Sequence, residues 1–355
     1  MSLALDVRGL TVELPARAGW VRPVNDVSFT LAPGETLGIV GESGSGKTIL
    51  SLALMGLEPH GARRKGEAWL ASTPVAGAKE ERRNLLALAP NEIRAMRGRE
   101  IAIIFQEPMT ALNPVMRVGA QIEEAIRVHE PRATATEIHR RAIESLEKAS
   151  VSDVERRARQ YPHQLSGGLR QRAMIAMALA ARPRVLIADE PTTALDVTVQ
   201  KQILELLAGL QRELQLSMLF ITHDLGVVAQ VADRIAVMYC GRIVETGPAM
   251  EVLRAPKHPY TEGLLRAAPK LVREKLVPIP GTVPALDALP PGCAFAPRCA
   301  YRVAECDTSV PNLRNVNAEH SARCILVPEN RSSERIPRAG NGAVRPPHGN
   351  ARNTP

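Results

Sequence analysis

The stretch from residue 41 to residue 48 reads Gly41-Glu42-Ser43-Gly44-Ser45-Gly46-Lys47-Thr48, a complete G-x-x-x-x-G-K-S/T phosphate-binding loop. A short apolar run, residues 36–40, precedes it and predicts a buried strand, and residues 49–57 continue as a helical pattern. In this order the backbone N–H groups of the loop and the N-terminus of the following helix face an anion. We therefore expect Lys47 to reach the β- and γ-phosphates of a nucleotide and Thr48 to ligate Mg²⁺. The complete motif between a strand and a helix disfavours the alternative, a Gly/Ser-rich turn without a ligand.

A second predicted strand ends in two carboxylates. Residues 185–188 are apolar, and Asp189 and Glu190 follow them directly. We expect Asp189 to contact Mg²⁺ through water and Glu190, one residue further, to polarise an attacking water. An apolar strand that runs into two acids is also common as a solvated turn, so this pair does not decide the function by itself.

More polar residues follow predicted strands or precede predicted helices. Gln106 directly follows the apolar residues 101–105, and His223 directly follows residues 219–222. Between them, Leu165-Ser166-Gly167-Gly168 precedes a helical segment and forms a second backbone nest that faces an anion. A lone histidine at a strand end is usually a satisfied polar group. Asp196 is a further polar residue, downstream of the two acids.

This order of motifs resembles the ATP-binding cassette of ABC transporters over roughly residues 5–260. The resemblance implies an α/β fold of the P-loop type, with a mixed sheet core, an antiparallel β subdomain and a helical subdomain. It also implies that two cassettes bind two ATP molecules head to tail, so that one chain cannot complete a site. The residues implied in nucleotide binding are Gly41, Glu42, Ser43, Gly44, Ser45, Gly46, Lys47, Thr48, Ser166, Gly167, Gly168, Asp189 and Asp196.

The same resemblance implies roles in catalysis. Glu190 would activate water, His223 would hold the γ-phosphate, and Gln106 would link the site to the membrane partner. Trp20 is the candidate for stacking on adenine, with ordinary loop packing as the alternative. The implied magnesium ligands are Thr48, Gln106 and Asp189.

Two positions depart from the pattern of the family. Leu169 stands where many cassettes have glutamine, and Thr193 stands where serine is more frequent. The first change leaves the Ser166 hydroxyl and the glycine backbone intact, and the second keeps a hydroxyl. We therefore expect the site to hydrolyse ATP.

A segment beyond the cassette restricts the resemblance to one branch of the family. His258-Pro259-Tyr260-Thr261 and residues 289–299 are similar to the C-terminal extension of the oligopeptide/dipeptide importer ATPases, a group that includes nickel importers. Residues 105–114 and 161–164 are similar to the same group of importer ATPases, so the resemblance covers about residues 5–326. It implies two transmembrane permease subunits, a second cassette that is a copy or a related subunit, and an external solute-binding protein. The chain would be peripheral on the cytoplasmic face of the inner (plasma) membrane and would import di- or oligopeptides or, alternatively, nickel.

A different class remains as an alternative, the soluble ABC ATPases of DNA repair or ribosome recycling. Those chains carry a long coiled coil between the motifs or two cassettes in one polypeptide. This chain has one phosphate loop and one Leu165-Ser166-Gly167-Gly168 signature, which favours the importer.

Four of the five cysteines lie close together in the extension, with the spacing C-x₅-C-x₆-C-x₁₇-C. Disulfides explain such a group poorly in a reducing compartment, so a metal is expected. Zinc sites usually contain C-x₂₋₄-C pairs, which are absent here. The resemblance favours a 4Fe-4S cluster, while zinc and unligated thiols remain open. Cys240 is expected in the core, on a strand of the cassette. The implied cluster ligands are Cys293, Cys299, Cys306 and Cys324.

Composition and charge set the remaining expectations. No apolar run reaches about 18 residues, so no membrane-spanning helix is expected, and the N-terminus lacks the pattern of a secretory signal. The net charge is +8, and residues 330–355 hold five arginines against one glutamate. This Pro- and Gly-rich tail is expected to be disordered, and an aromatic content of 3% argues against nucleic acid as a partner.

The expected domains follow from these segments. Residues 1–257 form the cassette, with a helical subdomain at about 110–175 in which Thr134 caps a helix. Residues 258–329 form the extension with the four cysteines, and residues 330–355 form the disordered basic tail.

Overall fold

The computed structural model describes residues 3–17, 19–71, 81–193, 195–267 and 278–328. The predicted basic tail, residues 330–355, lies outside the described residues, as do residues 268–277 of the extension.

A central sheet of eight strands lies in the described part of the chain, in the order β11-β12-β10-β9-β3-β8-β7-β6. Its members from β9 to β6 run parallel, and β10 turns back antiparallel beside β9. Every residue of β3, β7 and β8 is buried, as expected for parallel strands covered on both faces. The strands are β3 (Thr36–Val40), β6 (Ile101–Ile104), β7 (Val185–Asp189), β8 (Ser217–Thr222), β9 (Arg234–Tyr239), β10 (Arg242–Pro248), β11 (Arg314–Asn315) and β12 (Ser321–Ala322).

A second, antiparallel sheet covers one face of the central sheet. Its order is β2-β1-β4-β5, and its strands are β1 (Leu5–Ala16), β2 (Gly19–Leu31), β4 (Arg63–Ala71) and β5 (Arg82–Asn84). Side chains alternate along β8: Leu219 and Ile221 join the core shared with this sheet, whereas Met218 and Phe220 join the core on the other face. The period of two along a buried strand thus builds two hydrophobic cores.

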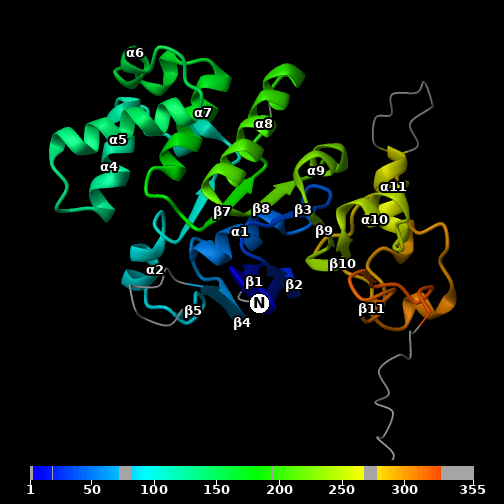
Figure 1. Ribbon diagram of the computed structural model, residues 1–355. Coiled ribbons are helices and arrows are strands. Elements are labelled where there is room, and N and C mark those ends of the chain that lie inside the picture. The colour runs from blue at the N-terminus through cyan, green and yellow to red at the C-terminus, as the bar shows by residue number, and fades with distance from the viewer. Residues whose placement is uncertain (1–2, 18, 72–80, 194, 268–277, 329–355) are drawn as a thin grey trace, which may run out of the picture.

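Helices pack against the sheets, and a group of them forms a lobe at one end of the molecule (Figure 1). Helix α1 packs between the two sheets, and α7, α8 and α9 contribute to the core on the opposite face. The lobe consists of α4, α5, α6 and part of α7, which contact one another. The helices are α1 (Lys47–Met55), α2 (Pro90–Met96), α3 (Pro108–Ala111), α4 (Val118–His129), α5 (Ala135–Lys148), α6 (Val154–Ala158), α7 (Gly167–Leu179), α8 (Val197–Leu214), α9 (Leu225–Val231), α10 (Ala249–Arg254) and α11 (Pro259–Ala267).

Several local predictions are confirmed. The strand predicted at residues 36–40 is β3, and the helix predicted after Lys47 is α1. The Thr134 hydroxyl accepts a hydrogen bond from the Glu137 N–H at 3.3 Å and so caps α5. Cys240 is buried, as expected, but it lies in the turn after β9 rather than on a strand.

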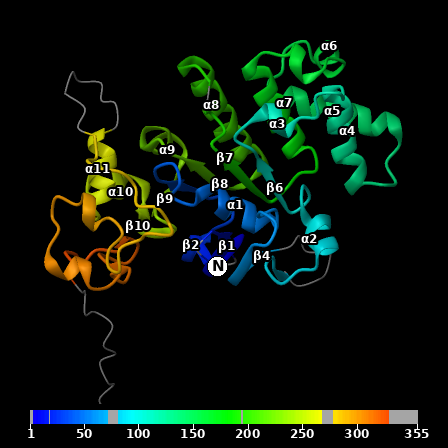
Figure 2. The same cartoon turned by 180° about the vertical axis from the view of Figure 1, so that it is seen from behind.

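The C-terminal extension is joined to the central sheet and lies at the end opposite the helical lobe (Figure 2). Strand β12 pairs with β10, which places Ala322 opposite Glu245. The fully buried Glu245 carboxylate lies 2.8 Å from His320 Nε2 and accepts the backbone N–H groups of Lys257 and His258. The extension also contains the 3₁₀ helices η2 (Ala296–Arg298) and η3 (Ala304–Asp307), whereas η1 (Pro162–Gln164) precedes α7.

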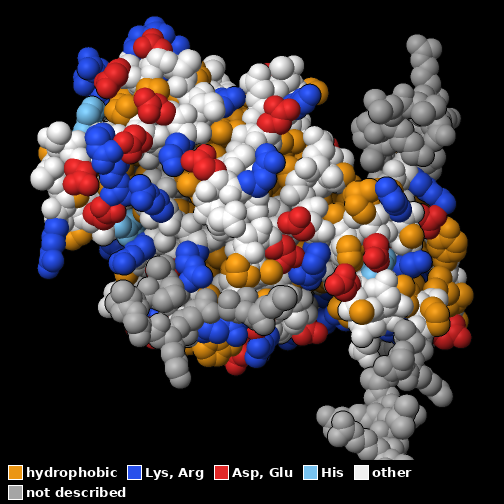
Figure 3. All heavy atoms as spheres, in the orientation of Figure 1, with side chains coloured by type: hydrophobic (Ala, Val, Ile, Leu, Met, Phe, Trp, Pro, Cys, Tyr) orange, Lys and Arg blue, Asp and Glu red, His pale blue; other side chains and the backbone are white. Residues whose placement is uncertain are grey.

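The two ends of the molecule have different surfaces (Figure 3). Lys/Arg and Asp/Glu side chains intermingle over the helical lobe, without a broad area of one sign on the visible face. Hydrophobic side chains gather over the extension. Among its described residues, the large hydrophobic side chains that are exposed include Tyr301, Val303, Val310, Leu313 and Leu326.

Candidate nucleotide site

The phosphate loop connects β3 to α1, and two of its glycines are required by the approach of neighbouring backbone. A Cβ atom on Gly41 would lie 2.2 Å from Met238 O, and one on Gly46 would lie 1.8 Å from Pro23 O. Gly46 also has a φ of 104°, in the region that favours glycine. The loop therefore fits against β9 and β2 only without side chains at these two positions.

Lys47 begins α1 and is buried against the loop from which it extends. Its Nζ atom donates to Gly41 O at 2.7 Å and to Glu42 O at 3.0 Å. Burial lowers the pKa of Lys47, and the nearby Glu190 and Asp189 carboxylates act in the opposite direction. The ammonium is thus held by two carbonyl oxygens that a phosphate could replace.

Asp189 ends β7 beside the start of α1. Ser51 Oγ donates to Asp189 Oδ2 at 3.1 Å, whereas the buried Oδ1 atom has no hydrogen-bond partner among the described residues. Burial raises the pKa of Asp189, and the Ser51 and Thr48 hydroxyls counteract this shift. Because a buried oxygen without a partner is costly, Asp189 fits a site for the hydrated Mg²⁺ that accompanies a nucleotide.

The next residue, Glu190, contacts three side chains through one carboxylate oxygen. Its Oε2 atom accepts a hydrogen bond from Thr193 Oγ1 at 2.9 Å and from Gln106 Nε2 at 3.2 Å, and lies 3.2 Å from His223 Nδ1. Its backbone has a φ of 47°, which is strained for a non-glycine residue, and its N–H donates to Ile221 O at 2.8 Å. The ends of β6, β7 and β8 thereby hold one carboxylate in place.

Lys47, Glu190 and the three side chains that contact Glu190 line one cavity of about 660 Å³, an ordinary size for a small-molecule site of ~300–1,000 Å³. The predicted residues Gly41, Ser45 and Asp189 are not part of its lining. The cavity brings together segments that are distant in the chain. Residues predicted from the sequence that line it are Glu42, Ser43, Gly44, Gly46, Lys47, Thr48, Gln106, Glu190 and His223. Pro23, Ile49, Thr193 and Leu286 line it as well.

The comparisons with known proteins agree with this geometry. The family description "ABC transporter" matches residues 24–193, and "Oligopeptide/dipeptide transporter, C-terminal region" matches residues 244–306. A Brucella melitensis protein named as a peptide import ATP-binding protein is 51% identical over 330 residues, which cover 90% of this chain and 96% of the relative. A Brucella abortus protein with the same kind of name is 47% identical over 322 residues, covering 90% and 94%. The chain belongs to the ATP-binding proteins of oligopeptide/dipeptide ABC transporters.

Solved ABC cassettes share the fold of this ABC ATPase. The dimeric post-hydrolysis structure of the ATP-binding cassette MJ0796 bound to ADP and Pi has a TM-score of 0.59 at 27% identity, covering 69% of this chain and 98% of that one. The structure of cbiO1 from Clostridium perfringens, part of the ABC transporter complex cbiONQ, has a TM-score of 0.57 at 24% identity, covering 72% and 92%, and this likeness concerns the fold alone. The predicted fold class is confirmed.

The signature of this ABC ATPase does not line the cavity of its own chain. Ser166 is exposed and caps α7, where its hydroxyl accepts the Leu169 N–H at 3.4 Å. A Cβ atom on Gly168 would lie 2.9 Å from a methyl group of Val199, on α8. Asp196 caps α8, because its side chain accepts a hydrogen bond from the Val199 N–H. Ser166, Gly167, Gly168 and Asp196 therefore form a separate group on the surface.

Sequence reasoning missed several contacts at the nucleotide site. Ser51 lies four positions after Lys47, and no motif marked it as a partner of Asp189. The sequence indicates for Thr193 only that a hydroxyl is kept, yet Thr193 makes the shortest of the three contacts with Glu190. The proposed adenine partner Trp20 does not line the cavity, and the Arg63 guanidinium lies 3.7 Å above its ring.

The four clustered cysteines lie close together in the extension. Cys293, Cys299, Cys306 and Cys324 all line one small cavity with Phe295 and Pro311. Burial raises the pKa of the Cys293, Cys299 and Cys324 thiols. No group of three or more His, Cys, Asp or Glu side chains in the described part of the chain is arranged to hold a metal ion.

Within the residues that the structure describes, no helix combines the length and the apolar character needed to cross a membrane.

Proposed function

We propose that this chain hydrolyses ATP in a membrane importer for di- or oligopeptides, at sites that are completed by a second cassette. The observation that carries the proposal is the contact of Thr193, Gln106 and His223 with the Glu190 carboxylate, in the same cavity as Lys47. A carboxylate fixed by several donors beside a phosphate-binding lysine is suited to orient and deprotonate a water.

Each residue at the site has a proposed role in this reaction. The loop N–H groups and Lys47 bind the phosphates, and Glu190 acts as the general base on the attacking water. His223 holds the γ-phosphate and keeps Glu190 oriented, while Gln106 connects the site to the permeases. Magnesium, held by Thr48, Gln106 and Asp189, would neutralise charge on the phosphates; the unpartnered Oδ1 atom of Asp189 supports this assignment.

The second cassette is proposed from the position of the signature. Ser166 and Gly167 are exposed at the N-terminus of α7, where backbone N–H groups suit an anion that comes from outside the chain. We propose that they contact the γ-phosphate bound by the partner cassette, with Gly168 and Asp196 beside them. The partner is a copy of this chain or a related subunit.

The place of the chain in the cell follows from this function. We propose that it binds two permease subunits at the cytoplasmic face of the inner membrane and that an external protein delivers the solute. The lobe within about residues 110–175 would dock on the permeases. The proposed units are the cassette, residues 1–257, the extension, residues 258–329, and the basic tail, residues 330–355.

A peptide is the proposed solute because the relatives are named as peptide import proteins, and nickel is the second candidate. The complete importer, with its solute-binding protein, should be reconstituted in proteoliposomes that contain ATP on the cassette side. We expect dipeptides or oligopeptides to stimulate ATP hydrolysis severalfold and to accumulate in the vesicles. Accumulation of Ni²⁺ without any response to peptides would favour the second candidate, and ATP hydrolysis without transport of either would contradict the importer.

We also propose that Cys293, Cys299, Cys306 and Cys324 bind a 4Fe-4S cluster. Support comes from the single cavity that all four line. The thiolates of a cubane lie further apart than the ligands of one tetrahedral ion, so a site for a cluster need not resemble a site for a single ion. The cluster would supply bonds that stabilise an extension with few large apolar residues.

A further inference from the structure

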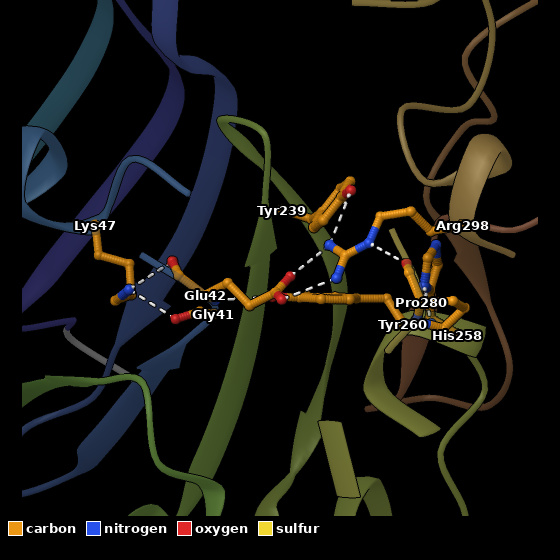
Figure 4. A network of polar contacts seen from close by, with 8 residues as sticks. All are labelled: Gly41, Glu42, Lys47, Tyr239, His258, Tyr260, Pro280 and Arg298. Carbon is orange, nitrogen blue, oxygen red and sulfur yellow. Dashed lines mark hydrogen bonds and ion pairs between the residues drawn. The ribbon is translucent and has the colours of Figure 1, made fainter. Parts of the chain in front are cut away.

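The C-terminal extension makes a direct ion pair with the phosphate loop. Arg298, at the end of η2, donates from Nη1 to Glu42 Oε2 at 2.7 Å and from Nη2 to Glu42 Oε1 at 3.0 Å. Figure 4 shows the two parallel contacts between the guanidinium and the carboxylate. The partners are 256 residues apart in the chain, so the contact depends on the docking of the extension against the cassette.

The guanidinium is held on its other sides as well. Arg298 Nε donates to Pro280 O at 3.0 Å, and Nη1 also lies 3.4 Å from the Tyr239 hydroxyl. Only 4% of the Arg298 side chain is exposed, and its pKa is raised, chiefly by the hydrogen bond with Glu42. A buried, bidentate arginine of this kind fixes both the position and the orientation of the carboxylate.

A second residue of the extension holds the backbone of the same loop residue. The Tyr260 hydroxyl accepts the Glu42 N–H at 2.8 Å. Tyr260 is fully buried. The centroid of its ring lies 4.5 Å from the ring centroid of Tyr239 and 5.4 Å from that of Phe295. Burial raises the pKa of Tyr260, so its hydroxyl stays protonated. This contact gives the Glu42 N–H a hydrogen-bond acceptor from the extension.

Glu42 also contacts Lys47, the residue proposed to bind the phosphates. Glu42 O accepts a hydrogen bond from Lys47 Nζ at 3.0 Å, so one residue links Arg298 to Lys47 (Figure 4). Leu286, also from the extension, lines the nucleotide cavity. The extension is therefore part of the wall of the site as well as its support.

We propose that Arg298 and Tyr260 are positioning residues of the nucleotide site, which hold Glu42 so that the phosphate loop is formed before ATP arrives. A glycine-rich loop loses much conformational freedom when it closes around phosphates. Contacts that order the loop in advance reduce this cost and strengthen binding. Neither side chain touches the Glu190 group in the contacts described above, so the effect falls on nucleotide affinity rather than on the chemical step.

The inference rests on the proposed nucleotide site and is tested first with the full-length chain. ATP and Mg²⁺ are titrated by calorimetry into wild type, Arg298→Gln, Glu42→Gln and the double variant. We expect Arg298→Gln to weaken ATP binding about tenfold and Glu42→Gln to have a similar effect. Because the two substitutions remove the same contact, the double variant should be little weaker than either single variant.

Three further variants separate positioning from other roles. Arg298→Lys keeps the charge but not the paired contacts, so we expect it to restore only part of the affinity. Tyr260→Phe removes the hydroxyl and keeps the ring, and we expect a loss of about threefold in affinity. The matched control is Arg302→Gln, which breaks an exposed pair with Asp307 in the same extension and should change affinity less than twofold.

Kinetics of the assembled transporter provide the second measurement. In Arg298→Gln the KM for ATP should rise while kcat at saturating ATP stays within about twofold of wild type. Equal ATP affinity in wild type, Arg298→Gln and Tyr260→Phe would overturn the inference, as would a loss of kcat without a change in KM. If Arg298→Gln does not fold, Tyr260→Phe and Arg298→Lys decide the outcome. A wild-type chain that does not bind ATP would refute the proposed function itself and with it this inference.

Discussion

His223 Nδ1 and Glu190 Oε2 lie 3.2 Å apart at the ends of the adjacent strands β8 and β7. The two residues are separated by 33 positions in the chain, and pairing of the strands brings them together. The contact brings a carboxylate and an imidazole together in the cavity that Lys47 also lines.

Replacement of Glu190 by Gln should abolish turnover while ATP binding is kept. The amide retains the shape of the side chain and can still contact Thr193, but it cannot take a proton from water. We expect ATP hydrolysis by the assembled complex to fall by about 10²–10⁴-fold and the closed cassette dimer to accumulate, as measured by steady-state hydrolysis and size-exclusion chromatography with ATP. Hydrolysis near the wild-type rate would remove Glu190 from this role.

The signature should act on the nucleotide of the partner cassette. Ser166→Arg places a bulky cation at an exposed cap that does not line the cavity of its own chain. We expect the affinity of the isolated chain for ATP to change less than twofold, while hydrolysis by the complex falls at least tenfold. Calorimetry on the isolated chain and hydrolysis by the complex are the two measurements. Loss of ATP binding by the isolated chain would contradict the head-to-tail arrangement.

Stability should decrease in acid because of a buried histidine. Burial lowers the pKa of His258 from 6.5 to about 3, so the folded chain keeps this ring neutral while the unfolded chain takes up a proton. The contribution of the neutral ring is complete above pH 6.5 and decreases as the pH falls toward 3, by about 3 kcal/mol between pH 7 and pH 4.

The test compares urea unfolding at pH 7 and pH 4 in wild type and in His258→Gln. The glutamine variant should be less stable at pH 7 but should lose less stability between the two pH values. Replacement of the exposed His163 by Gln is the matched control and should leave the wild-type pH dependence unchanged. Parallel pH dependence in wild type and His258→Gln would show that this ring is not the group responsible.

Protein purified without oxygen should contain iron at the four clustered cysteines. We expect about four irons per chain and broad absorbance near 400 nm, as is typical of thiolate-bound clusters. Cys299→Ser should bleach the protein, whereas Cys240→Ser, at a cysteine that does not line this cavity, should keep the colour. About one zinc per chain would favour a tetrahedral site, and the absence of both metals would indicate unligated thiols.

Local sequence by itself determined the parts of the site that are contiguous in the chain. The run from residue 36 to residue 57 predicts β3, the loop and α1, because the strand, the glycines and the helix all follow from short-range pattern and sterics. The same holds for Asp189 and Glu190 at the end of β7. The functional assignment required the order of several motifs, and the comparisons then confirmed the family.

Only the tertiary structure decided which distant residues meet. Thr193, Gln106 and His223 converge on Glu190 because parallel strands end at the same edge of the central sheet. No sequence pattern predicts that Arg298 pairs with Glu42 across 256 positions, because an ion pair has no periodicity and depends on how the extension docks. Local propensity and pattern are properties of neighbours in the chain, whereas this contact is a property of packing.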